Sequence, residues 1–339
     1  MDKEIVADFE NLYRSYKKVK NGKKFNSGTA RFSNMALEGI QILKEQLENQ
    51  TYGISPYNKF QIHEPKERTI ESCAFKDKVV QRCFSDYILT PKLEKILIKW
   101  NTAGQHGKGQ HMAMNGLRDQ MLDFYKRNGM NTWIVKCDIH KYFYSIDHEI
   151  MKDILDYYFD DDFTTWMNHL FIDSTDNPGL PLGNQVNQKY ALLLLHSLDQ
   201  MITIEFGNPY YGRYNDDFYV LCKTKDIARE ILEAIRMMIK SLRLELNPKS
   251  QIVPFRMGLC YLGFHHYVTD EGKYIRKLRG DRKRNTQKKV RRWVRAVNEE
   301  KMPMKKFNEK YGACRNHMLH GNCIKLCHSM DLEIERRMK

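Results

Sequence analysis

The stretch Arg213-Tyr214-Asn215-Asp216-Asp217-Phe218-Tyr219-Val220-Leu221-Cys222 places two adjacent acids between apolar and aromatic residues. Flanks rich in Tyr, Phe and Val favour β-strands, and Asn and Asp side chains favour a tight turn. The stretch therefore predicts a β-hairpin that presents Asp216 and Asp217 at its tip. Solvated acids are common in hairpin turns, so this pair alone does not separate a binding site from an ordinary surface turn.

A third acid follows a second predicted strand. Residues 133–137, Trp-Ile-Val-Lys-Cys, indicate a mostly buried strand that ends at Asp138. Carboxylates paired across a sheet can bind Mg²⁺, which prefers oxygen ligands and is often shared with substrate phosphates. Two such ions about 4 Å apart stabilise the attacking and leaving oxygens of a phosphoryl transfer. For Asp138 taken alone, a strand-end cap is the competing interpretation.

Five motifs then occur in a fixed order. They are Asp138 to Phe143, Leu180 to Gln188, Tyr214 to Asp217, Leu246 to Lys249, and Tyr261 to Phe264. This series resembles the palm of reverse transcriptases, and the resemblance covers about residues 55–330. The block Leu-Pro-Leu-Gly-Asn-Gln-Val-Asn-Gln resembles the Leu-Pro-x-Gly-Asn-x-x-x-Gln form of diversity-generating retroelement reverse transcriptases. Most other reverse transcriptases have Gln-Gly and Ser-Pro at that block.

The resemblance implies the α+β fold of a right-hand polymerase. Such a fold has fingers, a palm whose antiparallel sheet carries the catalytic acids, and a helical basic thumb. Helical spacing of apolar residues predicts an N-terminal helical extension over residues 1–50. The fingers would then occupy about residues 51–130 and the palm about residues 131–268, which together form the reverse transcriptase domain 51–268. Residues 269–339 would form the thumb.

The resemblance also implies the metal site and the chemistry. Asp138, Asp216 and Asp217 would bind two Mg²⁺ ions together with the backbone carbonyl of Ile139. Lys249 matches a motif whose lysine can protonate the pyrophosphate leaving group, although a surface lysine is the simpler interpretation.

Nucleotide contacts are expected from several segments. Lys66 and Arg68 lie two apart on a predicted strand and so point to one face, for which exposed strand charges are the plain interpretation. Their position matches the fingers motif of reverse transcriptases, and that resemblance implies contacts with the triphosphate. Phe143 would be the steric gate that excludes a ribose 2′-OH, although a core aromatic is the alternative. Gln188 would also contact the dNTP. The other residues implied by the resemblance are Leu182, Gly183 and Asn184 under the templating base pair, and Tyr261, Leu262, Gly263 and Phe264 as the primer grip.

Two positions depart from the family pattern. Asn187 stands where the family usually has Ser, and Asn215 stands where the turn usually has a small or apolar residue. Neither change removes a metal ligand, but both bear on fidelity.

The net charge of +14 is concentrated near the C-terminus. Between Lys273 and Lys310 there are 16 lysines and arginines against four acids. Val290, Trp293, Val294 and Val297 interrupt the charges at helical spacing, which predicts a basic amphipathic helix. Such a surface suits the phosphates of a nucleic acid, whereas a solvated basic face is the plain alternative. The expected contacts are Arg282, Lys283, Arg284, Lys288, Lys289, Arg291 and Arg292.

The composition limits the other possibilities. A chain of 339 residues with 42% hydrophobic and 29% charged residues fits a globular protein. No apolar run approaches the length of a membrane span, and the start lacks the apolar core of a signal peptide. Scattered cysteines and no export signal favour reduced thiols in the cytoplasm. Cys314, His317, His320, Cys323, Cys327 and His328 invite a zinc interpretation, but their spacing matches no familiar ligand pattern and also resembles a packing segment of the family thumb.

These observations predict an RNA-directed DNA polymerase. By resemblance it would use dNTPs, hold an RNA/DNA hybrid, copy a template-repeat RNA with errors opposite adenines, and bind a small basic accessory variability determinant protein. The alternatives are a retron-like or phage-defence reverse transcriptase, an RNA-dependent RNA polymerase and a non-catalytic RNA-binding protein. The Leu180–Gln188 block and the lack of a large extra C-terminal domain argue against a retron-like or phage-defence enzyme. A test of dNTP against NTP incorporation would separate an RNA polymerase. The three acids at the expected motif positions argue against a non-catalytic protein.

Overall fold

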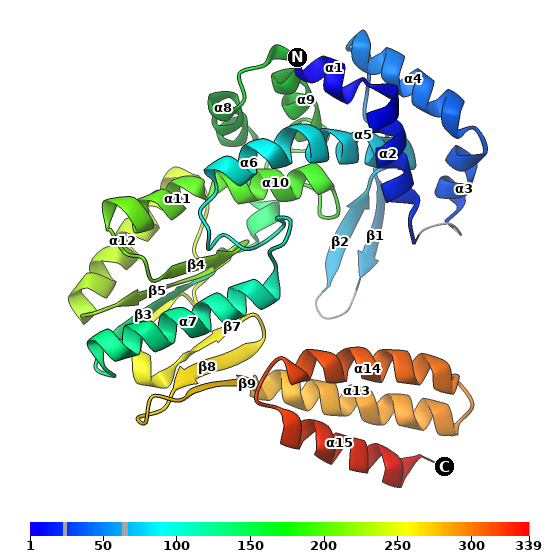
Figure 1. Ribbon diagram of the computed structural model, residues 1–339. Coiled ribbons are helices and arrows are strands. Elements are labelled where there is room, and N and C mark those ends of the chain that lie inside the picture. Colours follow the sequence, from blue (N-terminus) through cyan, green and yellow to red (C-terminus); the bar gives the residue numbers. More distant parts are fainter. Residues whose placement is uncertain (23–25, 63–66, 339) are drawn as a thin grey trace. The chain divides into compact units, whose positions relative to one another are not determined.

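The structure is a computed structural model that describes residues 1–22, 26–62 and 67–338. Its elements are labelled in Figure 1. The chain divides into two compact units, each built from three separate stretches of sequence. The first unit comprises residues 1–107, 138–207 and 233–248, and the second comprises residues 108–137, 208–232 and 249–339.

The first unit begins with the helical extension that the sequence predicts. Helix α2 starts after Asp8, whose carboxylate accepts a hydrogen bond from the Asn11 amide. It buries Leu12 and Tyr16, and the Tyr16 ring packs edge-on against Phe75. The four helices of the extension are α1 (Asp2–Val6), α2 (Phe9–Lys20), α3 (Ser27–Asn34) and α4 (Ala36–Glu48).

An antiparallel hairpin follows the helical extension. Strand β1 (Asn58–Ile62) pairs with β2 (Arg68–Ser72). Lys66 lies outside the described residues, and Arg68 opens β2. The hairpin leads into α5 (Phe75–Phe84), a π-helical turn η1 (Ser85–Leu89) and α6 (Thr90–Ile96).

Helices complete the first unit. Asp147 caps α8 by accepting a hydrogen bond from the Ile150 amide. The apolar helix expected from Gln185 to Leu198 is interrupted: α10 ends at Leu194 and a new helix begins at His196. Leu192 to Leu195 are all buried, so packing rather than a breaker residue sets this end. The elements are η2 (Tyr142–Tyr144), α8 (His148–Tyr158), α9 (Asp162–Ile172), α10 (Gln185–Leu194), α11 (His196–Gln200) and η3 (Met201–Glu205).

The second unit is built on a four-stranded antiparallel sheet in the order β4-β5-β3-β6. Its strands are β3 (Trp133–Cys137), β4 (Tyr211–Tyr214), β5 (Asp217–Cys222) and β6 (Gln251–Pro254). Helix α7 (Gln110–Asn128) packs against β4 and β8 and runs alongside the strands in Figure 1. Leu117, Met121, Phe124, Ile134 and Tyr219 form part of the shared core. The helix α12 (Lys225–Ser241) follows β5, and a 3-10 turn, η4 (Phe255–Met257), follows β6.

The C-terminal part of this unit combines a small sheet with three helices. Strands β7 (Leu259–Tyr261), β8 (Phe264–Val268) and β9 (Tyr274–Leu278) are antiparallel. They are followed by α13 (Gly280–Asn298), α14 (Met304–Leu319) and α15 (Ile324–Arg337), which pack on one another. Helix α13 buries Val290, Trp293 and Val294, which confirms the predicted basic amphipathic helix.

Within the described ranges, no helix combines the length and apolar character that crossing a bilayer requires.

Candidate active site

The hairpin of β4 and β5 has the form that the sequence predicts. Tyr214 pairs with Asp217, so Asn215 and Asp216 are the two residues of the connection. Asn215 has a φ of 55°, a left-handed conformation that asparagine tolerates better than most residues. The fully buried Arg213 donates from Nη1 to the Asn215 carbonyl at 3.1 Å. This bond fixes the turn and leaves Asp216 and Asp217 partly exposed at the tip.

Asp217 forms an ion pair with Lys136 of the neighbouring strand β3. Lys136 pairs directly with Tyr219, so Lys136, Tyr219 and Asp217 lie on one face of the sheet. The Lys136 ammonium also donates to the Cys137 carbonyl at 3.1 Å and lies 5.6 Å from the centre of the Tyr261 ring. The two side chains of the ion pair are only 16% and 26% exposed. Sequence reasoning missed this lysine, although its position two residues before the strand-end acid was a signal.

Asp138 is held in a different way, by the segment around Asn247. The Asn247 side-chain amide donates to the Asp138 carboxylate at 3.0 Å, and the Asn247 backbone N–H donates to the Asp138 carbonyl at 2.8 Å. Ile139 forms an antiparallel bridge with Leu246. The Leu246-Asn247 motif therefore fixes Asp138 and Ile139, a role that the sequence motif did not reveal.

The pairing of β3 with β5 defines where these acids leave the sheet. The last residue pair between the two strands joins Cys137 to Phe218. Asp138 directly follows Cys137 in the sequence, and Asp217 directly precedes Phe218. No group of three or more His, Cys, Asp or Glu side chains in the described part of the chain already surrounds a metal position.

The described cysteines and histidines of the C-terminal helices likewise form no group of three or more side chains that could hold a metal ion. Cys323 and Cys327 are buried in the core that α13, α14 and α15 share. The Cys323 thiol accepts a hydrogen bond from the Leu278 amide at 3.4 Å. These contacts support packing, the second of the two sequence interpretations, for this segment.

Phe143 lies beside the Leu-Pro-Leu-Gly loop. Its carbonyl accepts a hydrogen bond from the Leu180 amide at 2.7 Å, and its half-buried ring packs edge-on against Tyr142. Gly183 has a φ of 108°, and a Cβ added there would lie 3.8 Å from the Ile70 side chain. The loop that carries Leu182 and Gly183 thus passes next to strand β2.

Asn184 is fixed by Tyr57, a residue that sequence reasoning missed. The buried Asn184 amide donates to the Tyr57 hydroxyl at 2.8 Å, and that hydroxyl is also 2.8 Å from the Ser174 hydroxyl. Asn187 donates to the Pro181 carbonyl at 3.1 Å and so closes the loop. Gln188 is exposed on α10.

The predicted primer-grip segment is the hairpin of β7 and β8, with Leu262 and Gly263 as its two-residue connection. Both have positive φ, 48° and 92°, while Tyr261 and Phe264 are buried. A Cβ added at Gly263 would lie 3.1 Å from the Arg282 guanidinium carbon. Arg282, at the start of α13, therefore lies directly against the hairpin tip.

The other predicted contacts of α13 are mostly exposed, and Lys289 is half-buried. Arg291 donates from Nε and Nη2 to the Glu333 carboxylate at 2.7 and 3.3 Å, so it ties α13 to α15. Lys249 is exposed and lies shortly before β6.

An antiparallel sheet with acids at a hairpin tip, a fingers-like β-hairpin and a basic helical bundle define the class of nucleic-acid polymerases. The particular family follows from residues 58–266, which match the reverse transcriptase (RNA-dependent DNA polymerase) family. The chain belongs to this family. No curated protein matches the sequence significantly.

A solved structure of a telomerase shows a similar fold at low sequence identity. Apo telomerase from Candida tropicalis, truncated from its C-terminal domain, aligns with a TM-score of 0.51 and 11% identity over 69% of this chain. The alignment covers 59% of that telomerase chain. The partial Cas6-RT-Cas1–Cas2 complex aligns with a TM-score of 0.41 and 17% identity, over 72% of this chain and 43% of that one.

Proposed function

We propose that this reverse transcriptase copies the template-repeat RNA of a diversity-generating retroelement into cDNA with errors opposite template adenines. The observation that carries the proposal is the block Leu180-Pro-Leu-Gly-Asn-Gln-Val-Asn-Gln188, which resembles the form found in that subfamily. The hydrogen bonds of Asn184 to Tyr57 and of Asn187 to the Pro181 carbonyl support it, because they make this block a fixed surface next to β2.

Asp138, Asp216 and Asp217, with the Ile139 carbonyl, would hold two Mg²⁺ ions. The donor set fits because hard carboxylate oxygens are the ligands that Mg²⁺ prefers. The Lys136 ammonium is paired with the Asp217 carboxylate. The position beside this carboxylate therefore already accommodates a positive charge, which a metal ion would replace. When bound, the ions would neutralise triphosphate charge and lower the pKa of the primer 3′-hydroxyl.

The chain's own residues would position the substrates around these acids. Phe143 would exclude a ribose 2′-hydroxyl, and Lys249 would give a proton to the leaving pyrophosphate. Positioning and charge neutralisation carry most of such catalysis. Lys66, Arg68 and Gln188 would contact the dNTP, and Leu182 to Asn184 would lie under the templating base pair. Tyr261 to Phe264 would hold the primer end. The phosphates of the hybrid would be bound by basic residues of α13, namely Arg282, Lys283, Arg284, Lys288, Lys289, Arg291 and Arg292.

We propose a small basic protein, the accessory variability determinant, as a partner and the cytoplasm as the site of action. A retron-like or phage-defence reverse transcriptase is the alternative. It would share the acids but would copy adenines as faithfully as other bases.

Primer extension on a defined RNA, with Mg²⁺ and all four dNTPs, tests both levels of the proposal. We expect cDNA with misincorporation concentrated opposite adenines, and no extension by Asp216→Asn, whose RNA binding stays intact. Uniform fidelity would refute the retroelement role, and extension by Asp216→Asn would refute the metal-site assignment.

A further inference from the structure

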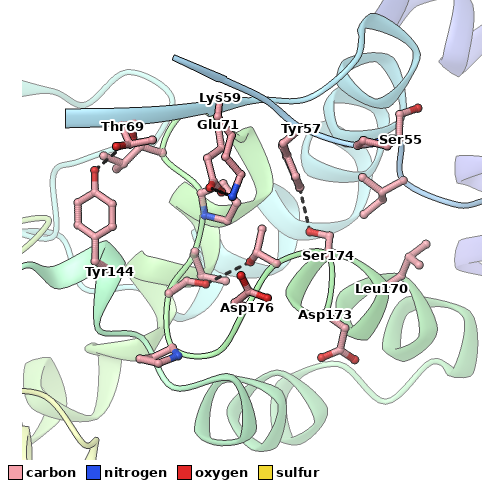
Figure 2. Close-up of a pocket in the computed structure, with 18 residues that line it drawn as sticks. Ser55, Tyr57, Lys59, Thr69, Glu71, Tyr144, Leu170, Asp173, Ser174 and Asp176 are labelled. Carbon is pink, nitrogen blue, oxygen red and sulfur yellow. Dashed lines mark hydrogen bonds and ion pairs between the residues drawn. The ribbon is translucent and has the colours of Figure 1, made fainter. Parts of the chain in front are cut away.

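A cavity of about 680 Å³ lies in the first unit, between the β1–β2 hairpin and residues 170–182. Figure 2 shows Tyr57, Lys59 and Glu71 on the hairpin side and Ser174 and Asp176 on the facing segment. Cavities of roughly 300–1,000 Å³ commonly hold small organic ligands. None of the expected catalytic residues lines it, although Leu182 of the expected template floor does.

The lining carries more negative than positive charge. Lys59 pairs with Glu71 at 2.8 Å, and this pair, with Asp176 as a smaller contribution, raises the pKa of the Lys59 ammonium. Asp173 pairs with Lys152 at 2.8 Å. Asp176 is exposed to the cavity. A phosphate group would therefore be repelled from this cavity, in contrast to the basic surface of α13.

Aromatic and apolar side chains form the rest of the walls. Tyr57 and Tyr144 line the cavity together with several prolines and leucines. The hydroxyls hold both rings in place: that of Tyr57 bonds Ser174 at 2.8 Å, and that of Tyr144 donates to the Thr69 carbonyl at 3.3 Å. Fixed aromatic faces of this kind stack on unpaired nucleobases.

We propose that this cavity binds one unpaired nucleobase with an amino group, and guanine in preference to the others. The carboxylates of Asp176 and Glu71 would accept from the guanine N1–H and 2-amino groups. The Lys59 ammonium would donate to O6 or N7, a contact typical of lysine with guanine. An arginine side chain from a protein partner fits less well, because it would leave the aromatic walls largely uncovered.

The base could belong to the RNA strand or to a free nucleoside, because both present the same hydrogen-bonding edge of guanine. In either case the sugar, and any phosphate, would lie outside the acidic wall. The proposal depends on the chain being an RNA-copying enzyme. It does not depend on the retroelement role.

Equilibrium dialysis of the full chain with labelled guanosine, inosine and uridine tests the nucleoside arm. We expect guanosine to bind most tightly, and inosine, which lacks the 2-amino group, to bind several-fold more weakly. Asp176→Asn should weaken guanosine binding by about tenfold, as expected for the loss of one charged contact to the base edge. Asp160→Asn, which alters an exposed acid of the same unit outside the cavity, should leave it unchanged.

The RNA arm uses a single-stranded oligonucleotide with one guanine, or with inosine at that position. If the wild type prefers the guanine oligonucleotide and Asp176→Asn loses that preference, the cavity binds a base of the RNA strand. If the wild type binds guanosine but shows no preference between the two oligonucleotides, the cavity binds a free nucleoside. Equal binding of all bases in both arms, or binding only of an arginine-rich peptide, would overturn the proposal. Primer extension by Asp176→Asn on a guanine-free template should stay within about twofold of wild type, so failure of the cavity proposal is distinguishable from failure of polymerisation.

Discussion

Asp138 and Asp217 are both acids at strand ends, but their surroundings differ in kind. Asp138 accepts a hydrogen bond from a neutral amide, that of Asn247. Asp217 is paired with a cation, Lys136. A neutral donor orients a carboxylate without offsetting its charge, whereas a lysine also offsets that charge. A divalent ion at Asp217 would therefore have to displace Lys136.

The largest expected effect comes from neutralising each acid in turn. Asp138→Asn and Asp217→Asn should each lower nucleotide incorporation on the order of 10²–10³-fold or more, because the proposed metal site would lose a negatively charged ligand. Their stabilities should differ. Asp217→Asn removes the partner of a poorly exposed lysine and should lower the melting temperature by roughly 2–4 °C.

The matched variant Asp138→Asn keeps an oxygen for the Asn247 amide and should melt within about 1 °C of wild type. Equal melting temperatures for the two variants, measured without divalent ions, would remove the contrast between the two acids.

The folding stability should also depend on pH through His266, which bonds the backbone of Tyr261, the residue whose ring lies beside Lys136. His266 bonds the Tyr261 carbonyl at 3.0 Å and the Tyr274 hydroxyl at 2.6 Å, and burial lowers its pKa to about 3. The unfolded chain has an ordinary histidine pKa of about 6.5, so it binds the proton more readily than the folded chain. Stability is then full above about pH 6.5 and falls as the pH drops toward 3, by about 2 kcal/mol at pH 5.

Melting curves between pH 8 and pH 5 measure this loss. His266→Gln, which has no titrating group, should reduce the slope over that range even if its stability is lower throughout. An unchanged slope would assign the acid sensitivity to other groups.

Replacing the competing lysine tests the contrast from the other side. Lys136→Met keeps the length of the side chain but removes its charge, so Mn²⁺ should bind about tenfold more tightly, equivalent to about 1.4 kcal/mol. Electron paramagnetic resonance of free Mn²⁺ measures the affinity without relying on polymerisation. Lys223→Met, at an exposed lysine after β5, is the control. Weaker or unchanged Mn²⁺ binding by Lys136→Met would contradict the displacement.

The smallest effect is expected at Asn247. Asn247→Ala removes one hydrogen bond from a neutral donor, which should cost about 1 kcal/mol of folding stability and lower incorporation by a few fold. Mn²⁺ affinity should change little, because no charge is altered. A loss as large as that of Asp138→Asn would mean that Asn247 does more than orient the carboxylate.

The local elements were predictable from the sequence because short-range signals determine them. Tyr, Phe and Val around Asn215-Asp216 specify the β4–β5 hairpin, and the spacing of Val290, Trp293 and Val294 specifies α13. The end of α10 at Leu194 was missed, since an all-apolar run contains no stop signal.

The contacts that shape the site were less predictable because they join distant residues. Tyr57 meets Asn184 and Lys136 meets Asp217 only once the chain has folded, and nothing local to Tyr57 marks it as a support for a loop more than a hundred residues away. Asn247 was visible as part of a motif, but its partner was not. The candidate acids themselves were found because they stand in an ordered series of five motifs that resembles reverse transcriptases; the adjacent pair alone would not have distinguished them from an ordinary hairpin turn.

The contact between Arg282 and Gly263 has a steric consequence. The guanidinium occupies the space where any larger residue at position 263 would place its side chain. A substitution at Gly263 would therefore push the Arg282 charge away from the hairpin tip, and it would also strain a turn whose φ is 92°.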